Sequence, residues 1–152
     1  IAIGSRLISG GQTTRCLSRE IVSRFYNQLL RLVFQTRIQD TQCGFKVLSA
    51  AASKTLLPQV EDRGWFWDSE LLLAAERQGW RILEHPIRWV ENPDSRVAVC
   101  RTAWLNLCGI YRLRRRFSRT KQDLLSRTLK KVGDNESVSV TPGEPNEQNQ
   151  SS

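Results

Sequence analysis

Apolar and polar residues follow one another along the chain in patterns that predict a mixed α/β structure. Residues 1–3 are apolar and are followed by a loop signal at Gly4, which is typical of the end of a buried strand. Apolar residues then recur every three or four positions, which predicts a long helix from Ser18, a favoured N-cap residue, to about Thr36. The stripe expected to face the core consists of Leu17, Ile21, Phe25, Leu29 and Val33, widened by Val22, Tyr26 and Leu30.

Four shorter elements are predicted between residues 47 and 90. Residues 47–48 indicate a short strand edge, and residues 49–57 indicate a helix that Pro58 closes. A second helix is predicted within residues 65–79, with Leu71, Leu72 and Ala75 inward and Gly79 just beyond its end. Residues 81–90 alternate between apolar and polar side chains, which predicts a strand, and Pro86 within it favours an edge or strand-start position.

The last third of the chain contains two segments of different composition. Residues 97–131 have a helical pattern and are rich in arginine, whereas residues 133–152 carry no apolar periodicity and no aromatic residue. We therefore expect three regions: an α/β portion at residues 1–96, a basic amphipathic helical region at 97–131 and a disordered tail at 132–152. No apolar run approaches the roughly 18 residues of a membrane-spanning helix, so none is expected.

The charge of the chain indicates the kind of partner, and its cysteines bear on metal binding and on the cellular compartment. The 23 Lys and Arg residues outnumber the 15 Asp and Glu residues, and every Lys and Arg lies at or before Lys131. Such a field favours an anionic partner: phosphate, nucleic acid or anionic lipid. The nucleic-acid interpretation has charge alone behind it, because the chain carries no recognisable reading motif. The four cysteines and single histidine show no zinc-ligand spacing, and scattered thiols suit a reducing compartment such as the cytoplasm.

Four short blocks in a fixed order carry the most specific signal. They are Asp-Thr-Gln-Cys-Gly-Phe-Lys at residues 40–46, Trp-Phe-Trp-Asp-Ser-Glu-Leu-Leu at 65–72, Glu-His-Pro-Ile-Arg-Trp at 84–89 and Asp-Ser-Arg at 94–96. This order resembles the second half of inverting family 2 glycosyltransferases, over residues 3–110. The branch it is most similar to is the dolichyl-phosphate glucosyl- and mannosyltransferases, which move a sugar from a nucleotide onto a polyprenyl phosphate.

The resemblance implies a fold and an activity. The fold would be the C-terminal portion of an α/β nucleotide-diphospho-sugar transferase (GT-A-like) fold, without the N-terminal nucleotide-binding half. The intact enzyme would use a divalent metal, Mg or Mn, whose ligands lie mostly in that missing half; no Asp-x-Asp triplet occurs in this chain. The expectation is a glycosyltransferase fragment that is inactive alone, and a first residue within a strand pattern fits truncation.

Transfer of a sugar to a lipid phosphate calls for arginines, because the acceptor is an anion and needs no strong base. Arg6 follows the first strand, and Arg19 and Ser23 are four residues apart and so share one helix face. By the resemblance, Arg6, Arg19 and Ser23 would bind the acceptor phosphate. The alternative is that both arginines are solvated surface charges.

The resemblance also implies residues at the reacting centre. Asp40 would be the catalytic carboxylate, orienting acceptor or donor. The residues implied for the sugar and diphosphate are Lys46, Asp68, Glu70, Ser95 and Arg96. Simpler alternatives stay open: Asp40 could pair with Arg37, and Asp68 and Glu70 could serve the positive end of their helix. Asp94 stands before Ser95 where a glycine is usual.

The basic helical region suggests where the protein works. Residues 104–116 combine Trp104, Tyr111 and leucines with Arg112, Arg114, Arg115 and Arg116, a composition common in helices that lie on anionic lipid. We expect a cytoplasmic protein, peripheral at the membrane surface. The partners would be a polyprenyl-phosphate acceptor, an anionic membrane and, once the missing half is supplied, a nucleotide-sugar. The alternative function is a non-catalytic membrane-surface or anion-binding module descended from the same fold.

Overall fold

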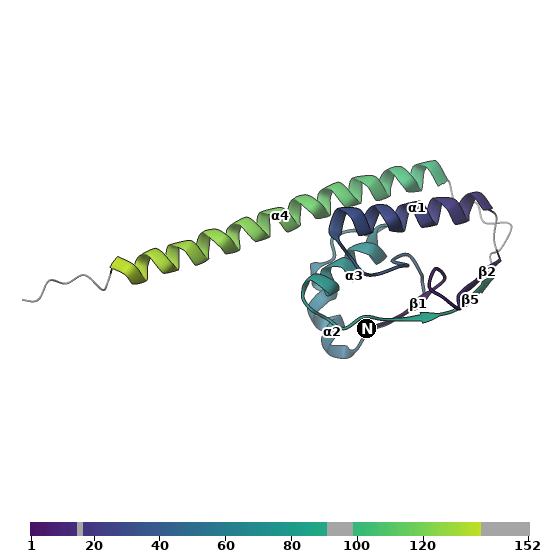
Figure 1. Ribbon diagram of the computed structural model, residues 1–152, viewed down its shortest axis with the longest axis horizontal. Coiled ribbons are helices and arrows are strands. Elements are labelled where there is room, and N and C mark those ends of the chain that lie inside the picture. Colours follow the sequence, from purple (N-terminus) through teal and green to yellow (C-terminus); the bar gives the residue numbers. More distant parts are fainter. Residues whose placement is uncertain (15–16, 91–98, 138–152) are drawn as a thin grey trace, which may run out of the picture. The chain divides into compact units, whose positions relative to one another are not determined.

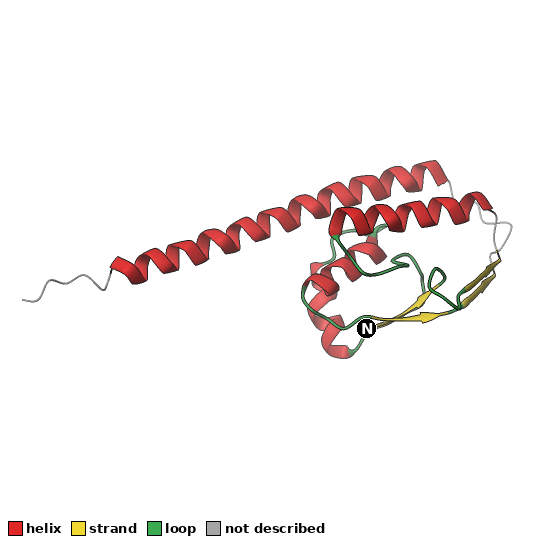
Figure 2. Ribbon diagram, in the orientation of Figure 1, coloured by secondary structure: helices red, strands yellow, loops and turns green. Residues whose placement is uncertain are grey.

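The computed structural model describes residues 1–14, 17–90 and 99–137, and within the last helix it describes side chains as far as Thr120, together with Gln122. The chain forms two compact units, residues 1–114 and 115–152. The first unit is an α/β structure with short strands and longer helices (Figure 2). The α/β class predicted from the sequence is therefore confirmed.

Two small sheets organise the first unit. Strand β1 (Ala2–Ser5) lies between β3 (Lys46–Val47), to which it is antiparallel, and β4 (Leu83–Pro86), to which it is parallel. Strand β2 (Gln12–Thr14) pairs in parallel with β5 (Arg88–Val90). The second sheet continues from the carboxyl ends of β1 and β4, because the Ile87 amide donates to the Ser5 carbonyl at 3.1 Å (Figure 1).

The helices of the middle segment begin and end where the sequence predicts. Helix α2 (Ala50–Leu56) is capped by Ser49, whose hydroxyl accepts from the Ala52 amide, and a 3-10 turn, η1 (Leu57–Gln59), follows it. Helix α3 (Trp67–Arg77) is followed by Gly79 with φ +77°, a backbone conformation that favours glycine. The strand predicted at residues 81–90 is present as β4 and β5, with Pro86 as the last residue of β4.

The last helix is longer than the sequence predicts. Helix α4 runs from Val99 to Ser137. The helix thus includes residues 132–137, where the sequence predicts the start of a disordered tail. The rest of that tail, residues 138–152, lies outside the described residues, and its disorder stays a prediction. No helix in the described part of the chain is both long and apolar enough to cross a membrane.

The core lies around α3, as the sequence predicts. Leu71 and Ala75 pack with Ala52, Leu56 and Val60 in one cluster. Leu72 packs with Ile3 of β1 and Ile38 in a second cluster. Helix α3 therefore joins the sheet to the α2 segment, and burial of its leucines stabilises both contacts.

The stripe predicted to bury helix α1 (Leu17–Phe34) is wrong for its first half. The buried residues of α1 are Tyr26, Asn27 and Leu30. Leu17, Ile21 and Phe25 are 72%, 58% and 69% exposed. The physical reason is that α1 meets the core through a polar network and one leucine, whereas part of its apolar face borders a cavity.

Candidate functional site

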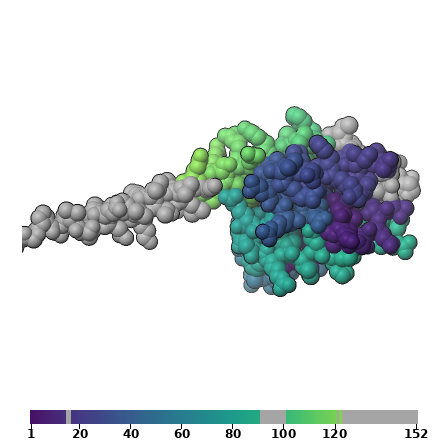
Figure 3. All heavy atoms as spheres, in the orientation of Figure 1, coloured from purple at the N-terminus to yellow at the C-terminus, as the bar shows by residue number. Residues whose placement is uncertain are grey.

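A cavity of about 460 Å³ lies between α1 and the first part of α4. The apolar part of its lining comes from both helices, the turn before α3 and strand β5: Val22, Phe25, Leu29, Trp65, Trp89 and Leu107. The polar lining includes Arg6, Arg19, Ser23, Asp68 and Asn106. Atoms of α1 and of the first part of α4 adjoin on the face shown in Figure 3. The cavity thus combines a long apolar surface with a cluster of polar and cationic groups.

Arg6 reaches the cavity from the end of β1 and is held by Asp40. The Arg6 Nε donates to Asp40 Oδ2 at 2.7 Å, and Nη2 donates to Oδ1 at 2.8 Å. The backbone amide of Arg6 also donates to Oδ2 at 3.0 Å. The ring of Trp89 lies 5.9 Å from the guanidinium carbon, within cation–π range. These contacts fix the guanidinium plane.

Burial and pairing with Asp40 shift the pKa of Arg6 in opposite directions. Burial alone lowers the pKa of its guanidinium, but the hydrogen bond and the charge of Asp40 more than offset this, and the net pKa is raised. Arg6 therefore stays cationic. Because Asp40 faces a single edge of the planar group, formed by Nε–H and one Nη2–H, the Nη1 hydrogens and the second Nη2 hydrogen take no part in this pair.

Asp40, predicted to be catalytic, is fully buried and does not line the cavity. Its partner is Arg6 rather than Arg37, which lies three residues away in sequence. The loop that carries it is held from β4: Glu84 accepts from the Gln39 amide at 2.8 Å and from the Asp40 amide at 3.3 Å. In this structure Asp40 acts on the cavity through Arg6.

Arg19 and Ser23 both line the cavity, as their shared helix face predicts. They are joined there by Asp68, whose Oδ1 lies 2.8 Å from Nζ of Lys46. The Lys46 side chain is almost fully buried and its ammonium also donates to the Cys43 carbonyl. The structure therefore brings Arg6, Arg19, Ser23 and Asp68 to one cavity, with Lys46 behind Asp68.

Glu70, also predicted to be a site residue, lies away from the cavity and contacts the loop before α3. It is buried, does not line the cavity, and accepts hydrogen bonds from the backbone amides of Glu61 at 3.2 Å and Asp62 at 2.9 Å. Its contacts thus organise the loop before α3. Ser95 and Arg96 lie outside the described residues, so their predicted contact with the diphosphate stays a prediction.

A buried polar network that sequence reasoning missed joins the walls of the cavity. The Tyr26 hydroxyl lies 2.8 Å from Ser69 Oγ, which lies 3.0 Å from Thr41 Oγ1. Asn27 Oδ1 accepts from both the amide and the hydroxyl of Thr41. Burial raises the pKa of Tyr26, so it remains a neutral donor. The network ties α1, the 40–46 loop and α3 together, and no periodicity in the sequence signals it.

The first part of helix α4 contacts the rest of the first unit at Phe66 and at Asp62. Gly109 lies so close to Phe66 that an added Cβ would be 2.3 Å from the ring. Arg112 Nη2 lies 2.6 Å from Asp62 Oδ2 in the loop that Glu70 holds. These contacts set the position of Asn106 and Leu107 in the cavity wall.

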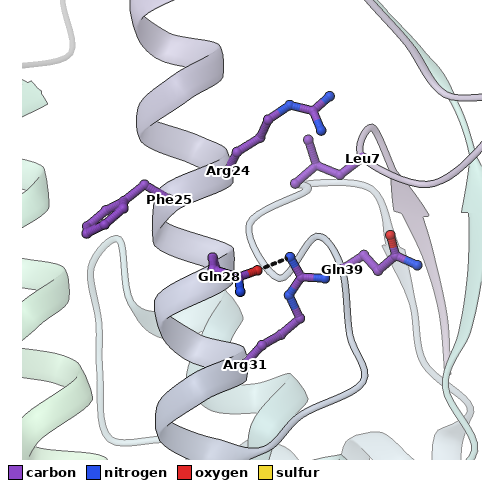
Figure 4. Close-up of a pocket in the computed structure, with 6 residues that line it drawn as sticks. All are labelled: Leu7, Arg24, Phe25, Gln28, Arg31 and Gln39. Carbon is purple, nitrogen blue, oxygen red and sulfur yellow. Dashed lines mark hydrogen bonds between the residues drawn. The ribbon is translucent and has the colours of Figure 1, made fainter.

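A second hollow of about 480 Å³ lies beside α1. Figure 4 shows Arg24, Gln28 and Arg31 of α1 directed toward Leu7 and Gln39, and Phe25 pointing away from them. Arg31 Nη2 donates to Gln28 Oε1 at 2.6 Å, and Arg24 is bonded to Glu20. Its arginines thus have partners on their own helix.

Metal binding has no support among the described residues. They contain no group of three or more His, Cys, Asp or Glu side chains that could hold one ion. No residue of this chain is therefore assigned as a metal ligand.

Curated proteins similar to this chain are glycosyltransferases. Glycosyltransferase AglD of Haloferax volcanii is 41% identical over 100 residues, which cover 66% of this chain and 16% of that protein. The relatives also include dolichyl-phosphate β-glucosyltransferases, from Saccharomyces cerevisiae (33% identical over 102 residues) and Drosophila melanogaster (34% over 99). These cover 65% and 64% of the chain. The chain therefore resembles dolichyl-phosphate glycosyltransferases, as its sequence blocks predict.

The similarity has a defined extent. The chain spans about 30% of the length of the yeast and fly relatives. No family model matches the chain, and no solved structure matches it.

Proposed function

We propose that this chain forms the acceptor-binding part of a glycosyltransferase with a GT-A-like fold, which moves a sugar from a nucleotide-sugar to a polyprenyl phosphate. The observation that carries the proposal is the cavity between α1 and α4. Its cationic and hydroxyl groups, Arg6, Arg19 and Ser23, suit a phosphate, and its apolar wall suits an isoprenoid chain. The names of the yeast and fly relatives, dolichyl-phosphate β-glucosyltransferases, support the same acceptor chemistry.

The residues then have separate roles. Arg6 and Arg19 hold the phosphate by charge-assisted hydrogen bonds, and Asp40 positions Arg6 for that task. Asp68 is assigned the role of accepting a hydrogen bond from a sugar hydroxyl; its place in the cavity lining and its contact with Lys46 support this assignment. A phosphate oxygen of the acceptor attacks the anomeric carbon, and the nucleoside diphosphate leaves with the bonding electron pair.

Donor binding is proposed to depend on sequence outside these 152 residues. The described side chains provide no group of three that could hold a divalent metal, and the sequence contains no Asp-x-Asp triplet. Mg or Mn would serve the intact enzyme through ligands elsewhere. The chain alone is thus expected to bind the acceptor without transferring sugar to it.

The first prediction concerns Arg19. Replacing it with alanine is expected to weaken binding of farnesyl phosphate, a short polyprenyl phosphate, about ten- to hundredfold, because a hydrogen bond to a charged group contributes roughly 1.5–3 kcal/mol. Titration followed by tryptophan fluorescence measures this, since Trp65 and Trp89 line the cavity. Arg24→Ala is the matched control: Arg24 is on the same helix but does not line this cavity. Equal losses for both variants would show that charge on α1, rather than the cavity, binds the ligand.

A second prediction concerns membrane attachment. Several residues that line the cavity, including Phe25, Trp65 and Leu107, are also largely exposed, as are Trp104 and Tyr111 of α4. Such a surface suits a bilayer that delivers a lipid acceptor. Replacing Arg114 and Arg116 with glutamine is expected to weaken binding to anionic vesicles by about 2 kcal/mol, at roughly 1 kcal/mol for each basic residue.

Co-sedimentation with phosphatidylserine and phosphatidylcholine vesicles measures this change. Binding of the unaltered chain should fall with salt and should be weak on neutral phosphatidylcholine. Tight, salt-independent binding to neutral vesicles would argue against electrostatic attachment, and preference for oligonucleotides over vesicles would favour the nucleic-acid interpretation.

A further inference from the structure

Asn106 is a buried polar residue whose presence in α4 is not explained by packing. Its side chain is 4% exposed, and its Oδ1 has no hydrogen-bond partner among the described residues. It lines the cavity between α1 and α4. Ser23 of α1 lines the same cavity, and its Oγ is likewise buried without a partner in the described part of the chain.

A buried amide oxygen without a hydrogen-bond partner, such as Asn106 Oδ1, weakens the fold and therefore needs a reason. Buried side-chain polar atoms are nearly always hydrogen-bonded, and an apolar residue of similar shape would serve the fold better. The other α4 residues that line the cavity are Thr102, Ala103 and Leu107, and none of them gives Asn106 Oδ1 a hydrogen-bond partner. The remaining partner for its amide is a molecule that occupies the cavity.

We propose that Asn106 binds the phosphate of the acceptor together with Ser23, so that α4 supplies a residue to the head-group site. The inference rests on the function proposed above and extends it to a helix that the sequence blocks do not include. A half-turn of the amide exchanges its oxygen and nitrogen, and the NH2 group then donates to a phosphate oxygen as the Ser23 hydroxyl does.

The number and position of hydrogen-bond donors in the cavity support the assignment of Asn106 to the phosphate. Arg6 gives its Nε hydrogen and one Nη2 hydrogen to Asp40, so only part of its fork remains for a ligand. The three terminal oxygens of a phosphate monoester are strong acceptors that can take hydrogen bonds from several directions. Neutral donors from Ser23 and Asn106 fill the remaining directions from two different helices.

The test compares affinity with stability in the 152-residue chain. Asn106→Leu is expected to weaken binding of farnesyl phosphate about tenfold, while the thermal midpoint stays unchanged or rises, because the variant removes an unsatisfied buried amide. Asn106→Asp, assayed at pH 8 where the carboxyl group is ionised, should weaken binding further, since a carboxylate cannot donate and repels phosphate. Gln28→Glu adds the same charge to α1 outside this cavity and should bind nearly as the unaltered chain.

A second ligand separates the head group from the tail. Farnesol carries the same isoprenoid chain without phosphate, so its affinity should be unchanged by both Asn106 substitutions. A lower thermal midpoint in Asn106→Leu, with equal losses for farnesol and farnesyl phosphate, would make Asn106 a structural residue and overturn the inference. Unchanged farnesyl phosphate binding in both variants would overturn the inference about Asn106 and leave the proposed function standing. Failure of the unaltered chain to bind farnesyl phosphate would overturn the proposed function as well.

Discussion

Replacing Asp40 with leucine is expected to lower the free energy of unfolding by about 3–5 kcal/mol, because it leaves Arg6 buried without its partner. Asp40 is fully buried, and only 12% of the Arg6 side chain is exposed. The pair is bidentate, at 2.7 and 2.8 Å, and the Arg6 amide also depends on the same carboxylate. Natural domains are stable by only about 5–15 kcal/mol, so this one change removes a large share.

The double variant Arg6→Met/Asp40→Leu distinguishes a costly unpaired charge from a simple loss of packing. Replacing both charges with apolar groups should recover most of the stability, although the Arg6 amide then lacks its acceptor. Urea unfolding followed by circular dichroism measures the unaltered chain, the single variants Asp40→Leu and Arg6→Met, and the double variant. A double variant as unstable as Asp40→Leu alone would show that the carboxylate stabilises the fold mainly through the backbone amide rather than through Arg6.

The elements that the sequence predicts well are those with local signals. Ser49 and Pro58 bracket α2, and Gly79 follows α3 with the positive φ that its position requires. Capping groups and prolines act within a few residues of where they stand, so a sequence pattern contains them completely. The β2–β5 pairing has no such signal, because it joins two three-residue strands far apart in the chain.

The apolar face of α1 shows that helical periodicity does not tell whether such a face packs on the core. Leu17, Ile21 and Phe25 recur at helical spacing, as core residues do, yet all three are exposed. A helical stripe that borders a cavity or a lipid has the same pattern as one that packs on a core. Sequence pattern alone therefore identifies an apolar surface without identifying what covers it.

The sequence indicated individual candidate residues of the site, but it did not indicate which of them contact one another. Arg6, Arg19 and Ser23, assigned from the sequence to the acceptor phosphate, line the same cavity as Asp68, assigned to the sugar and diphosphate. Asp40 pairs with Arg6, which lies 34 residues away, and such a contact depends on the packing of β1 against the 40–46 loop. Asn106 gave only a weak signal, as a polar residue within an otherwise apolar helical run.

Substitution of Gly109 by valine should destabilise the first unit by about 3 kcal/mol and weaken farnesyl phosphate binding with it. An added Cβ would lie 2.3, 2.6 and 2.8 Å from three ring carbons of Phe66, and Phe66 is itself buried. Overpacking of a core contact typically costs about 1–3 kcal/mol and sometimes more. Helix propensity acts in the opposite direction, since glycine is the poorer helix former, but by less than about 1 kcal/mol. The clash therefore decides the sign.

Two further variants show whether the contact with Phe66 is the cause. Gly44→Val is the matched control, because a Cβ at Gly44 meets no atom within 4 Å, and it should leave the unfolding midpoint nearly unchanged. Phe66→Leu should relieve the clash, so Gly109→Val should cost less in that background than in the unaltered chain. Additive effects of Gly109→Val and Phe66→Leu would show that α4 is not fixed through this pair. In that case, the wall that carries Asn106 and Leu107 would depend mainly on the Arg112–Asp62 contact.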